Sequence, residues 1–476
     1  MALKAPRDFG KGPVWKNILA QALPLTVAQA VLLLYNVVDR IYIGHMGEDG
    51  ALALTGLGLT FPVVTIVMAF AALFGMGGVP LFSIARGEGD DKKAGRILGN
   101  ACFALLCSAA AVTVLCLVFC RPLLFAFGAT QASYAFAGPY LQIYLCGAVF
   151  SMLATGLNGY INAQGFPAVG MLSVIIGAVC NIALDPVCIF ALHLGVRGAA
   201  LATVVSQAVS AAWVLRFLCS RRPPVRLTGK DMTPDGRILK DIAKLGTSNF
   251  IMQGTACLVQ VACNTTLQRF GGDLYVGVMT VLSSVREVFT LAVTGMVSGA
   301  LPVISYNYGA KQFDRVKQGI RFNTLAGAAY TLFAWLLVVL FPHVWVSVFT
   351  DDPATIDTGS AMLRIYFFGF VFMALQFAGQ STFQALGDAK RAIFFSLLRK
   401  AVIVVPLTLL LPLTALGVKG VFWAEPISNF LGGTACFVTM YLTRYRKMGE
   451  EEGKKQEGKK QESKIQESKK IERRNP

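Results

Sequence analysis

The chain has 476 residues, of which 55% are hydrophobic and only 14% are charged, and its formal net charge is +17. Soluble domains contain about 25% charged residues, so the composition excludes an ordinary soluble protein and indicates a membrane protein. The positive charge does not indicate nucleic-acid binding, because lysines and arginines cluster in alternate loops between apolar runs, as membrane topology requires.

Long apolar runs recur along the chain, and we count twelve of them. Since about 20 apolar residues form a helix that crosses about 30 Å of hydrocarbon, we predict an all-α polytopic membrane protein with twelve transmembrane helices. Basic clusters precede the first run, follow the second and separate the sixth from the seventh. By the positive-inside rule, we expect a multi-pass protein of the cell membrane with both termini cytoplasmic.

The two halves of the chain repeat each other at a constant offset. Adding 222 to a residue number in the first half gives its equivalent in the second, as for Gly77 and Gly299, Pro80 and Pro302, Tyr144 and Tyr366, Gly165 and Gly387, and Ser206 and Ser428. One offset that holds over about 130 residues indicates a tandem duplication. Six spans separate equivalent positions, so both halves have the same orientation and we predict two six-helix bundles related by an axis along the membrane normal.

The repeat and the charge pattern divide the chain into five expected segments. These are a cytoplasmic N-terminal segment (1–14), an N-lobe of helices 1–6 (15–219), a cytoplasmic linker (220–240), a C-lobe of helices 7–12 (241–443) and a charged cytoplasmic tail (444–476). The tail repeats GKKQE and ESK, and such a segment has too little apolar surface to fold, so we expect it to be disordered.

The first apolar run contains the carboxylate Asp39. A carboxylate at bilayer depth costs several kcal/mol, about 2.5 to 3.5 at a helix centre, and is usually kept where it binds or relays something. The alternative is that Asp39, next to Arg40 and six residues before His45, is a helix-end charge in the headgroup region. Tyr35 precedes Asp39 by one helical turn, so both side chains share a face.

The fifth apolar run contains the second carboxylate, Asp185, with Asn181 four residues before it and Pro186 after it. Four residues separate neighbours on one helix face, and proline weakens the backbone hydrogen bonding of its turn. Thr203 follows the Gly195 to Gly198 turn and could present its hydroxyl at similar depth. Together with Asp39, these residues predict a site for a proton or sodium ion; the alternative for Asp185 is a carboxylate that stabilises a kink.

The second half offers glutamines and cations in its spans. Gln376, Gln380 and Gln384 recur every four residues and predict a polar stripe on one helix face. We expect this stripe to line the substrate chamber, and the alternative is interhelical hydrogen bonding. Arg399 and Lys400 either face the cavity or extend to the cytoplasmic interface, and we expect the second, because long basic side chains snorkel. Glu287 directly follows Arg286, and the two could form a local ion pair.

Several stretches resemble the multidrug and toxic compound extrusion (MATE) transporters, in particular the bacterial cation-coupled exporters. The resemblance covers residues 15–443 and includes the segment around Asp39, ARGEGDDKKAGRILGNA, NGYINAQGFP, CNIALDP, GVRGAALATVVSQ and ISYNYGA. It implies a cation site at Asp39, Asn181, Asp185 and Thr203. It also implies a bend of the first helix at Pro24 and a chamber lined by Tyr35, Tyr140 and Asn158.

The chain departs from one branch of this family, whose members carry acidic residues in the seventh and tenth helices. It has glutamines there instead, for example Gln253, Gln260 and Gln376, so a charged cation site in the C-lobe is not expected. For Tyr140 and Asn158, interhelical polar packing is the alternative to lining the chamber.

The expected function is that of a secondary active antiporter, which exports organic, cationic drugs or toxic metabolites in exchange for H⁺ or Na⁺ by alternating access. The alternative is a lipid-linked oligosaccharide flippase of the same architecture. An enzyme is not expected, because the sequence shows no nucleophile with a base and its three histidines are unpaired. The absence of GxxxxGK[ST] argues against ATP as the direct energy source. We expect no cofactor beyond the coupling ion, no metal beyond a possible Na⁺, membrane lipid and a small organic molecule as partners, no nucleic acid, and a monomer.

Overall fold

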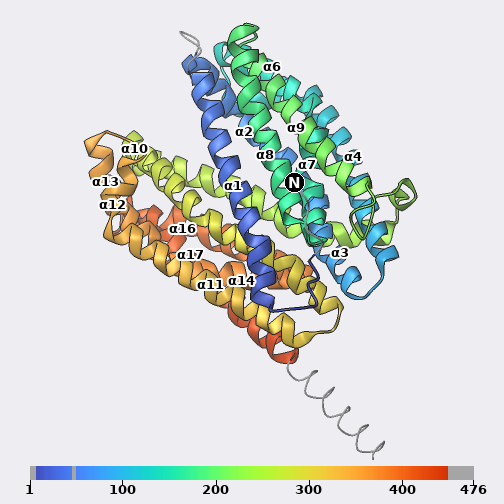
Figure 1. Cartoon of the computed structure of the whole chain (residues 1–476). Helices are drawn as coiled ribbons and strands as arrows, with labels where there is room; N and C mark the ends of the chain where they lie inside the picture. The colour runs from blue at the N-terminus through green and yellow to red at the C-terminus, as the bar shows by residue number, and fades with distance from the viewer. Residues whose placement is uncertain (1–6, 45–49, 449–476) are drawn as a thin grey trace, which may run out of the picture.

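The computed structural model describes residues 7–44 and 50–448, apart from the side chains at positions 40, 41, 44, 50–52 and 54. His45 and residues 449–476 of the expected tail lie outside the described residues. Within these ranges every regular element is a helix, so the all-α prediction is confirmed. The helices form two bundles, one from each half of the chain (Figure 1).

The first half of the chain forms the N-lobe. Its elements are α1 (Val14–Gly44), α2 (Gly50–Ala71), a π-helical turn (Ala72–Met76), α3 (Gly77–Gly87), α4 (Asp91–Val118), α5 (Cys120–Ala126), α6 (Gln131–Cys146), α7 (Ala148–Ala163), α8 (Pro167–Pro186), a second π-helical turn (Val187–Ala191) and α9 (Val196–Cys219). α6 and α7 are bent by 55° at their junction and together form one apolar span. A short 3-10 helix (Gly229–Met232) follows α9.

The second half forms the C-lobe, and its first helix already begins at Gly236, inside the expected linker. Its elements are α10 (Gly236–Gly309), α11 (Phe313–Leu340), α12 (Pro342–Ser347), α13 (Pro353–Phe367), α14 (Phe370–Ala385), α15 (Ala389–Leu397), a π-helical segment (Leu398–Val404), α16 (Val405–Leu410), a 3-10 turn (Leu411–Leu413), α17 (Lys419–Met440) and a π-helical turn (Tyr441–Tyr445). The last helix continues to Met448, so residues 444–448 of the expected tail are helical.

The described helices account for twelve crossings of a membrane. Eight are long and apolar enough on their own, and two bent pairs, α6 with α7 and α13 with α14, bring the number to ten. α10 has 74 residues and is broken at Gly272, where φ is 70° and ψ is −167°, a conformation that favours glycine. It therefore supplies two spans, and the 22-residue α17 supplies the last.

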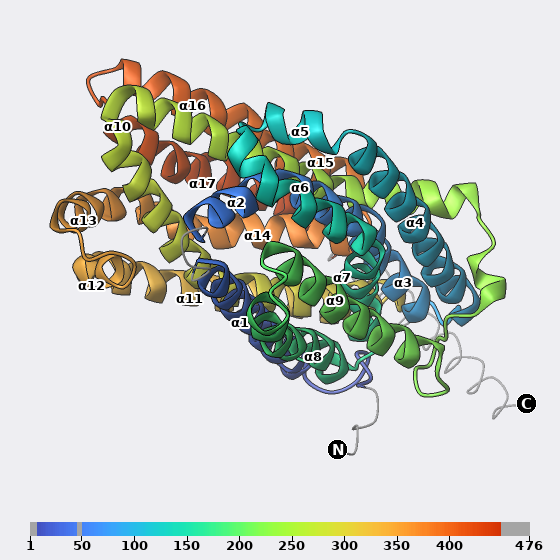
Figure 2. The same ribbon diagram turned by 90° about the horizontal axis from the view of Figure 1, so that it is seen from above.

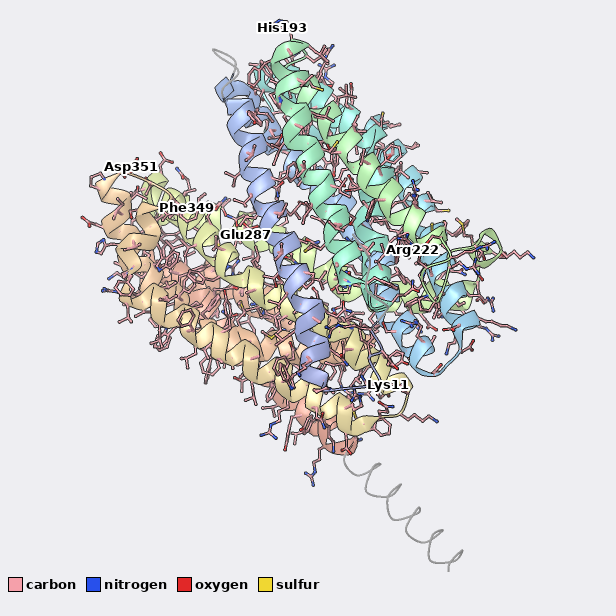
Figure 3. All side chains as sticks on the ribbon, viewed as in Figure 1. Lys11, His193, Arg222, Glu287, Phe349 and Asp351 are labelled. Atoms are coloured by element: carbon pink, nitrogen blue, oxygen red, sulfur yellow. The ribbon has the colours of Figure 1, made fainter. Side chains whose placement is uncertain are left out.

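The two lobes contact each other at the end of the molecule where Phe9 and Met448 are buried in one cluster. α10 packs there against α1, α3 and the π-helical turn that precedes α3. Figure 3 shows Lys11 at this end and His193, Phe349 and Asp351 at the opposite end, where the two bundles diverge. The N-terminal segment also joins the lobes, since Arg7 N donates to Gly165 O while Asn307 and Arg315 donate to Phe9 O.

Candidate functional site

The structure brings the two predicted carboxylates of the N-lobe together. α1 packs on α8 and α8 packs on α9 (Figure 2), and these contacts bury Asp39 and Asp185, whose residues are 8% and 0% exposed. The two carboxylates are close enough to repel each other electrostatically. Asp185 Oδ1 is buried and accepts no hydrogen bond from the described residues, so this oxygen has unused acceptor capacity.

Asn181 links Asp185 to the neighbouring helix. With its amide oriented so that both ends are satisfied, Asn181 Nδ2 donates to Asp185 Oδ2 (2.8 Å) and Asn181 Oδ1 accepts from Thr203 N (3.2 Å). The Thr203 hydroxyl donates to Ala199 O at 3.0 Å. The close packing of α9 on the π-helical turn that follows α8 depends on Gly198, since a Cβ at this position would lie 2.5 Å from Cys188 O.

Two tyrosines border the same site. Tyr35 lies one turn before Asp39 on α1, and Tyr140 comes from α6; both have Thr203 as a side-chain hydrogen-bond partner and both interact electrostatically with Asp39. The ring of Tyr140 also stacks on Tyr144, with centroids 6.5 Å apart. Six of the predicted residues therefore converge on one place: Tyr35, Asp39, Tyr140, Asn181, Asp185 and Thr203.

The structure places Asn158 and Pro24 away from these carboxylates. Asn158 Nδ2 donates to Gly170 O and to Ser173 Oγ, both at 3.0 Å. Ser173 precedes Asn181 by eight residues on α8, which is about 12 Å along a helix. Asn158 thus takes part in the interhelical packing of α7 against α8, the alternative that the sequence left open. α1 remains helical across Pro24.

The three glutamines of α14 make hydrogen bonds between helices. Gln376 Nε2 donates to Gln380 Oε1 (3.0 Å), and Gln380 Nε2 donates to Ser248 Oγ on α10 (3.2 Å). Gln384 Nε2 donates to Asn249 Oδ1 at 3.0 Å. These contacts connect α14 to α10, so the stripe makes the interhelical hydrogen bonds that the sequence offered as the alternative to lining a cavity.

Sequence reasoning missed a buried charge cluster in the C-lobe. Glu425 on α17 is 5% exposed, and its Oε1 accepts from Arg286 (2.7 Å), Arg399 (3.3 Å) and Lys400 (3.0 Å). The prediction that Arg399 and Lys400 snorkel to the interface is therefore wrong, because the two side chains find a buried carboxylate as partner. Among the described residues, the partner of Arg286 is Glu425 and not the adjacent Glu287.

A signal for Glu425 was present in the sequence. The repeat offset relates Glu425 to Thr203, so Glu425 occupies the C-lobe position that matches a predicted site residue of the N-lobe. Figure 3 shows Glu287, on the same helix as Arg286, well between the two ends of the molecule, so this part of α10 lies near the middle of the length of the bundle.

Comparisons with known proteins agree with this architecture. The family model MatE matches residues 24–187 and 250–410. The multidrug export protein MepA of Staphylococcus aureus (strain N315) is 25% identical over 438 residues, which are 92% of this chain and 96% of that protein. MepA of Staphylococcus saprophyticus is 23% identical over 440 residues, with the same coverage.

Solved structures share the fold. "Crystal structure of MATE in the bent conformation" has a TM-score of 0.88 at 24% identity and covers 94% of this chain and 99% of its own. A Pyrococcus furiosus transporter of the MOP superfamily, described by a binding pocket of reverse polarity, has a TM-score of 0.87 at 23% identity, with the same coverage. The relatives do not favour the flippase alternative. Since the MatE model matches more than half of the chain, the chain belongs to the MatE family, the multidrug and toxic compound extrusion transporters, and is a multi-pass membrane transporter rather than an enzyme.

Proposed function

We propose that this transporter is a secondary active antiporter, which exports organic, cationic drugs or toxic metabolites in exchange for H⁺ or Na⁺ by alternating access. The observation that carries the proposal is the burial of Asp39 and Asp185 side by side within one lobe. Two carboxylates in a dry site repel each other, so a bound proton or sodium ion stabilises the pair.

Asn181 and Thr203 complete the proposed cation site. The Asn181 amide bridges Asp185 and the backbone of α9 and thereby positions the carboxylate, and hydroxyl and carboxylate oxygens are suitable ligands for a hard cation. Tyr35 and Tyr140 would border the site, where their hydroxyls interact with Thr203. Pro24 is the proposed bend of α1, because proline removes a backbone hydrogen bond within a helix. We do not propose chamber roles for Asn158 or the three glutamines, whose hydrogen bonds support packing.

The energetics of this exchange are sufficient for export. One elementary charge that crosses 100 mV releases about 2.3 kcal/mol, which corresponds to a concentration ratio of about 50. Binding of the ion can drive the change between two open states only through a difference in affinity between them. We propose that both termini are cytoplasmic and that the ion enters from the opposite side. We also propose that the protein acts as a monomer, because a single chain supplies both lobes.

The test is transport by the full-length protein in liposomes. Efflux of a fluorescent lipophilic cation is followed under separately imposed pH and sodium gradients, for the wild type, Asp39→Asn, Asp185→Asn and the control Asp357→Asn. Asp357 is exposed on α13, far from the pair in sequence and on the other lobe. We expect the first two variants to lose gradient-driven efflux and the control to keep it. Equal efflux from all four proteins would remove the coupling role of the acid pair.

A further inference from the structure

The C-lobe cluster carries more positive than negative charge. Arg286, Arg399 and Lys400 all hydrogen-bond to Glu425, and Lys400 Nζ reaches both of its oxygens, at 3.0 and 3.2 Å. Among the described residues, Glu425 is the only carboxylate that pairs with these three cations. Arg399 also donates to Asn429 Oδ1 at 2.8 Å, a neutral acceptor. Two formal positive charges are therefore left without an anion.

A cavity adjoins this cluster. Its volume is about 120 Å³, and its polar wall is formed by Arg286, Lys400, Glu425, Gln260, Ser283 and Thr408. On this scale a water molecule needs only about 10 to 15 Å³, so the cavity has room for a small polyatomic group. Arginine and lysine side chains directed at such a space form charge-assisted hydrogen bonds to anionic oxygens.

The local backbone directs two consecutive cations inward. Arg399 and Lys400 lie in the π-helical segment Leu398–Val404, and both are buried, at 9% and 7% exposed. In a regular α-helix consecutive side chains point in different directions. Irregular π-helical turns occur frequently at functional sites, and a structural ion pair with Glu425 would have required only one cation here.

The repeat relates this cavity to the proposed cation site. Glu425 is the equivalent of Thr203 in the repeat, and an axis along the membrane normal places equivalent residues at equal depth. The N-lobe position holds two carboxylates, whereas the C-lobe position holds two excess cations. The two lobes therefore present polar sites of opposite charge at the same depth.

We propose that the C-lobe cavity at Arg286, Lys400 and Glu425 binds a carboxylate, carried either by the exported compound or by a small free organic anion. The carboxylate competes with Glu425 for Lys400 and Arg286 and brings the charge of the cluster closer to zero. Where the carboxylate belongs to the cargo, the inference rests on the proposed export function and extends the cargo to organic cations that also carry an acid group.

The test compares two dyes that differ in one group. Rhodamine B has a cationic ring system and a carboxylate, and its ethyl ester lacks the carboxylate. Binding of each dye to the purified full-length protein in nanodiscs is measured by fluorescence polarisation, with sodium benzoate or neutral benzamide as competitor. We expect the wild type to prefer the acid over the ester by about tenfold or more, the effect of a charged hydrogen bond, and benzoate alone to compete.

Two variants should change this preference in opposite directions. Lys400→Gln removes a donor and should abolish the preference, whereas Glu425→Gln removes the competing carboxylate and should increase it. Lys419→Gln, at the exposed start of α17, is the control. General damage to the fold would instead weaken the binding of both dyes to both variants. Because a ligand that binds the folded state raises Tm, benzoate should also raise the Tm of the wild type more than that of Lys400→Gln.

The outcomes separate the two sources of the carboxylate and the two proposals. Displacement of rhodamine B by benzoate supports a carboxylate of the cargo; a rise of Tm with benzoate, without any preference between the dyes, supports a free anion. Equal binding of both dyes together with no effect of benzoate on Tm overturns the anion site. Gradient-driven efflux of the ester depends on Asp39 and Asp185, so its loss or retention tests the antiport proposal independently.

Discussion

Gly87 on α3 and Gly309 on α10 make reciprocal contacts across the two lobes. A Cβ at Gly87 would lie 2.0 Å from Tyr306 O, and a Cβ at Gly309 would lie 2.1 Å from Ile84 O. Gly87 and Gly309 are equivalent positions of the repeat, as are Ile84 and Tyr306. The crossing of α3 and α10 therefore follows the symmetry of the repeat, and each lobe supplies the small residue that lets the other approach, as is common in membrane helix packing.

Alanine at Gly87 or Gly309 should hold the two lobes apart where α3 crosses α10. Contacts below 3.0 Å to backbone atoms cannot be relieved by a side-chain rotation, so the helices must separate, and the state with this end closed loses population. We expect slower transport and faster amide hydrogen exchange in α3 for both variants. Gly277→Ala is the control, because a Cβ there meets nothing within 4 Å. Exchange and transport like those of the wild type would contradict this role.

Thr203 is the common hydrogen-bond partner of the proposed cation site. Thr203→Val keeps the shape of the side chain and removes the hydroxyl used by Tyr35 and Tyr140. Loss of such a buried partner costs about 1 to 3 kcal/mol, so the ion concentration for half-maximal efflux should rise by about 5- to 160-fold. Efflux is measured in liposomes against external pH and sodium. Thr324→Val, whose hydroxyl bonds only to Ile320 O of its own helix, should leave the curve unchanged.

Helical periodicity and the apolar surroundings of the two carboxylates predicted much of the candidate site in the N-lobe. Asn181 and Asp185 are four residues apart, so any α-helix over this run brings them to one face, and the apolar surroundings of Asp39 indicated that its carboxylate is buried. The convergence of α1, α6, α8 and α9 depends on contacts between residues far apart in the chain, and only the family resemblance grouped Tyr140 with the others.

The C-lobe cluster could not be predicted from local pattern. Arg399 and Lys400 are adjacent, and on a regular helix one of them would point away from the interior. The π-helical segment allows both side chains to point inward, and no pattern in the sequence predicted this segment. Glu425 and Arg286 lie far apart in the chain, so their pairing depends on the packing of α17 against α10. The sequence alone favoured an ion pair between Arg286 and its neighbour Glu287.

Ser248 provides a test of whether the glutamines of α14 serve packing. Its hydroxyl accepts from Gln380 Nε2 and Gln384 Nε2 and donates to Ala392 O, and the residue is fully buried. Ser248→Ala leaves these groups without a partner, at a cost of about 1 to 3 kcal/mol. We expect a lower Tm by thermal unfolding, with an unchanged KM for the exported dye. Ser284→Ala, whose hydroxyl bonds only within its own helix, is the control; a changed KM with an unchanged Tm would support a cavity role instead.

Asp388, in the loop between α14 and α15, should make stability depend on pH. Burial alone would raise the pKa of Asp388, but hydrogen bonds from Arg444 and Arg391 outweigh it, and the pKa is lowered. A carboxyl group with a lowered pKa in the folded state stabilises that state at pH values above its pKa in the unfolded state, near 3.9. This contribution is lost as the pH falls through the folded-state pKa.

Asp388→Asn should therefore unfold a few degrees below the wild type near pH 7, and the difference in Tm should shrink as pH falls below about 4. Thermal unfolding between pH 3 and about 7 measures this, with Asp357→Asn as the control. A difference in Tm that is the same at every pH would mean that the side chain acts through its shape and its cap of α15, not through its charge.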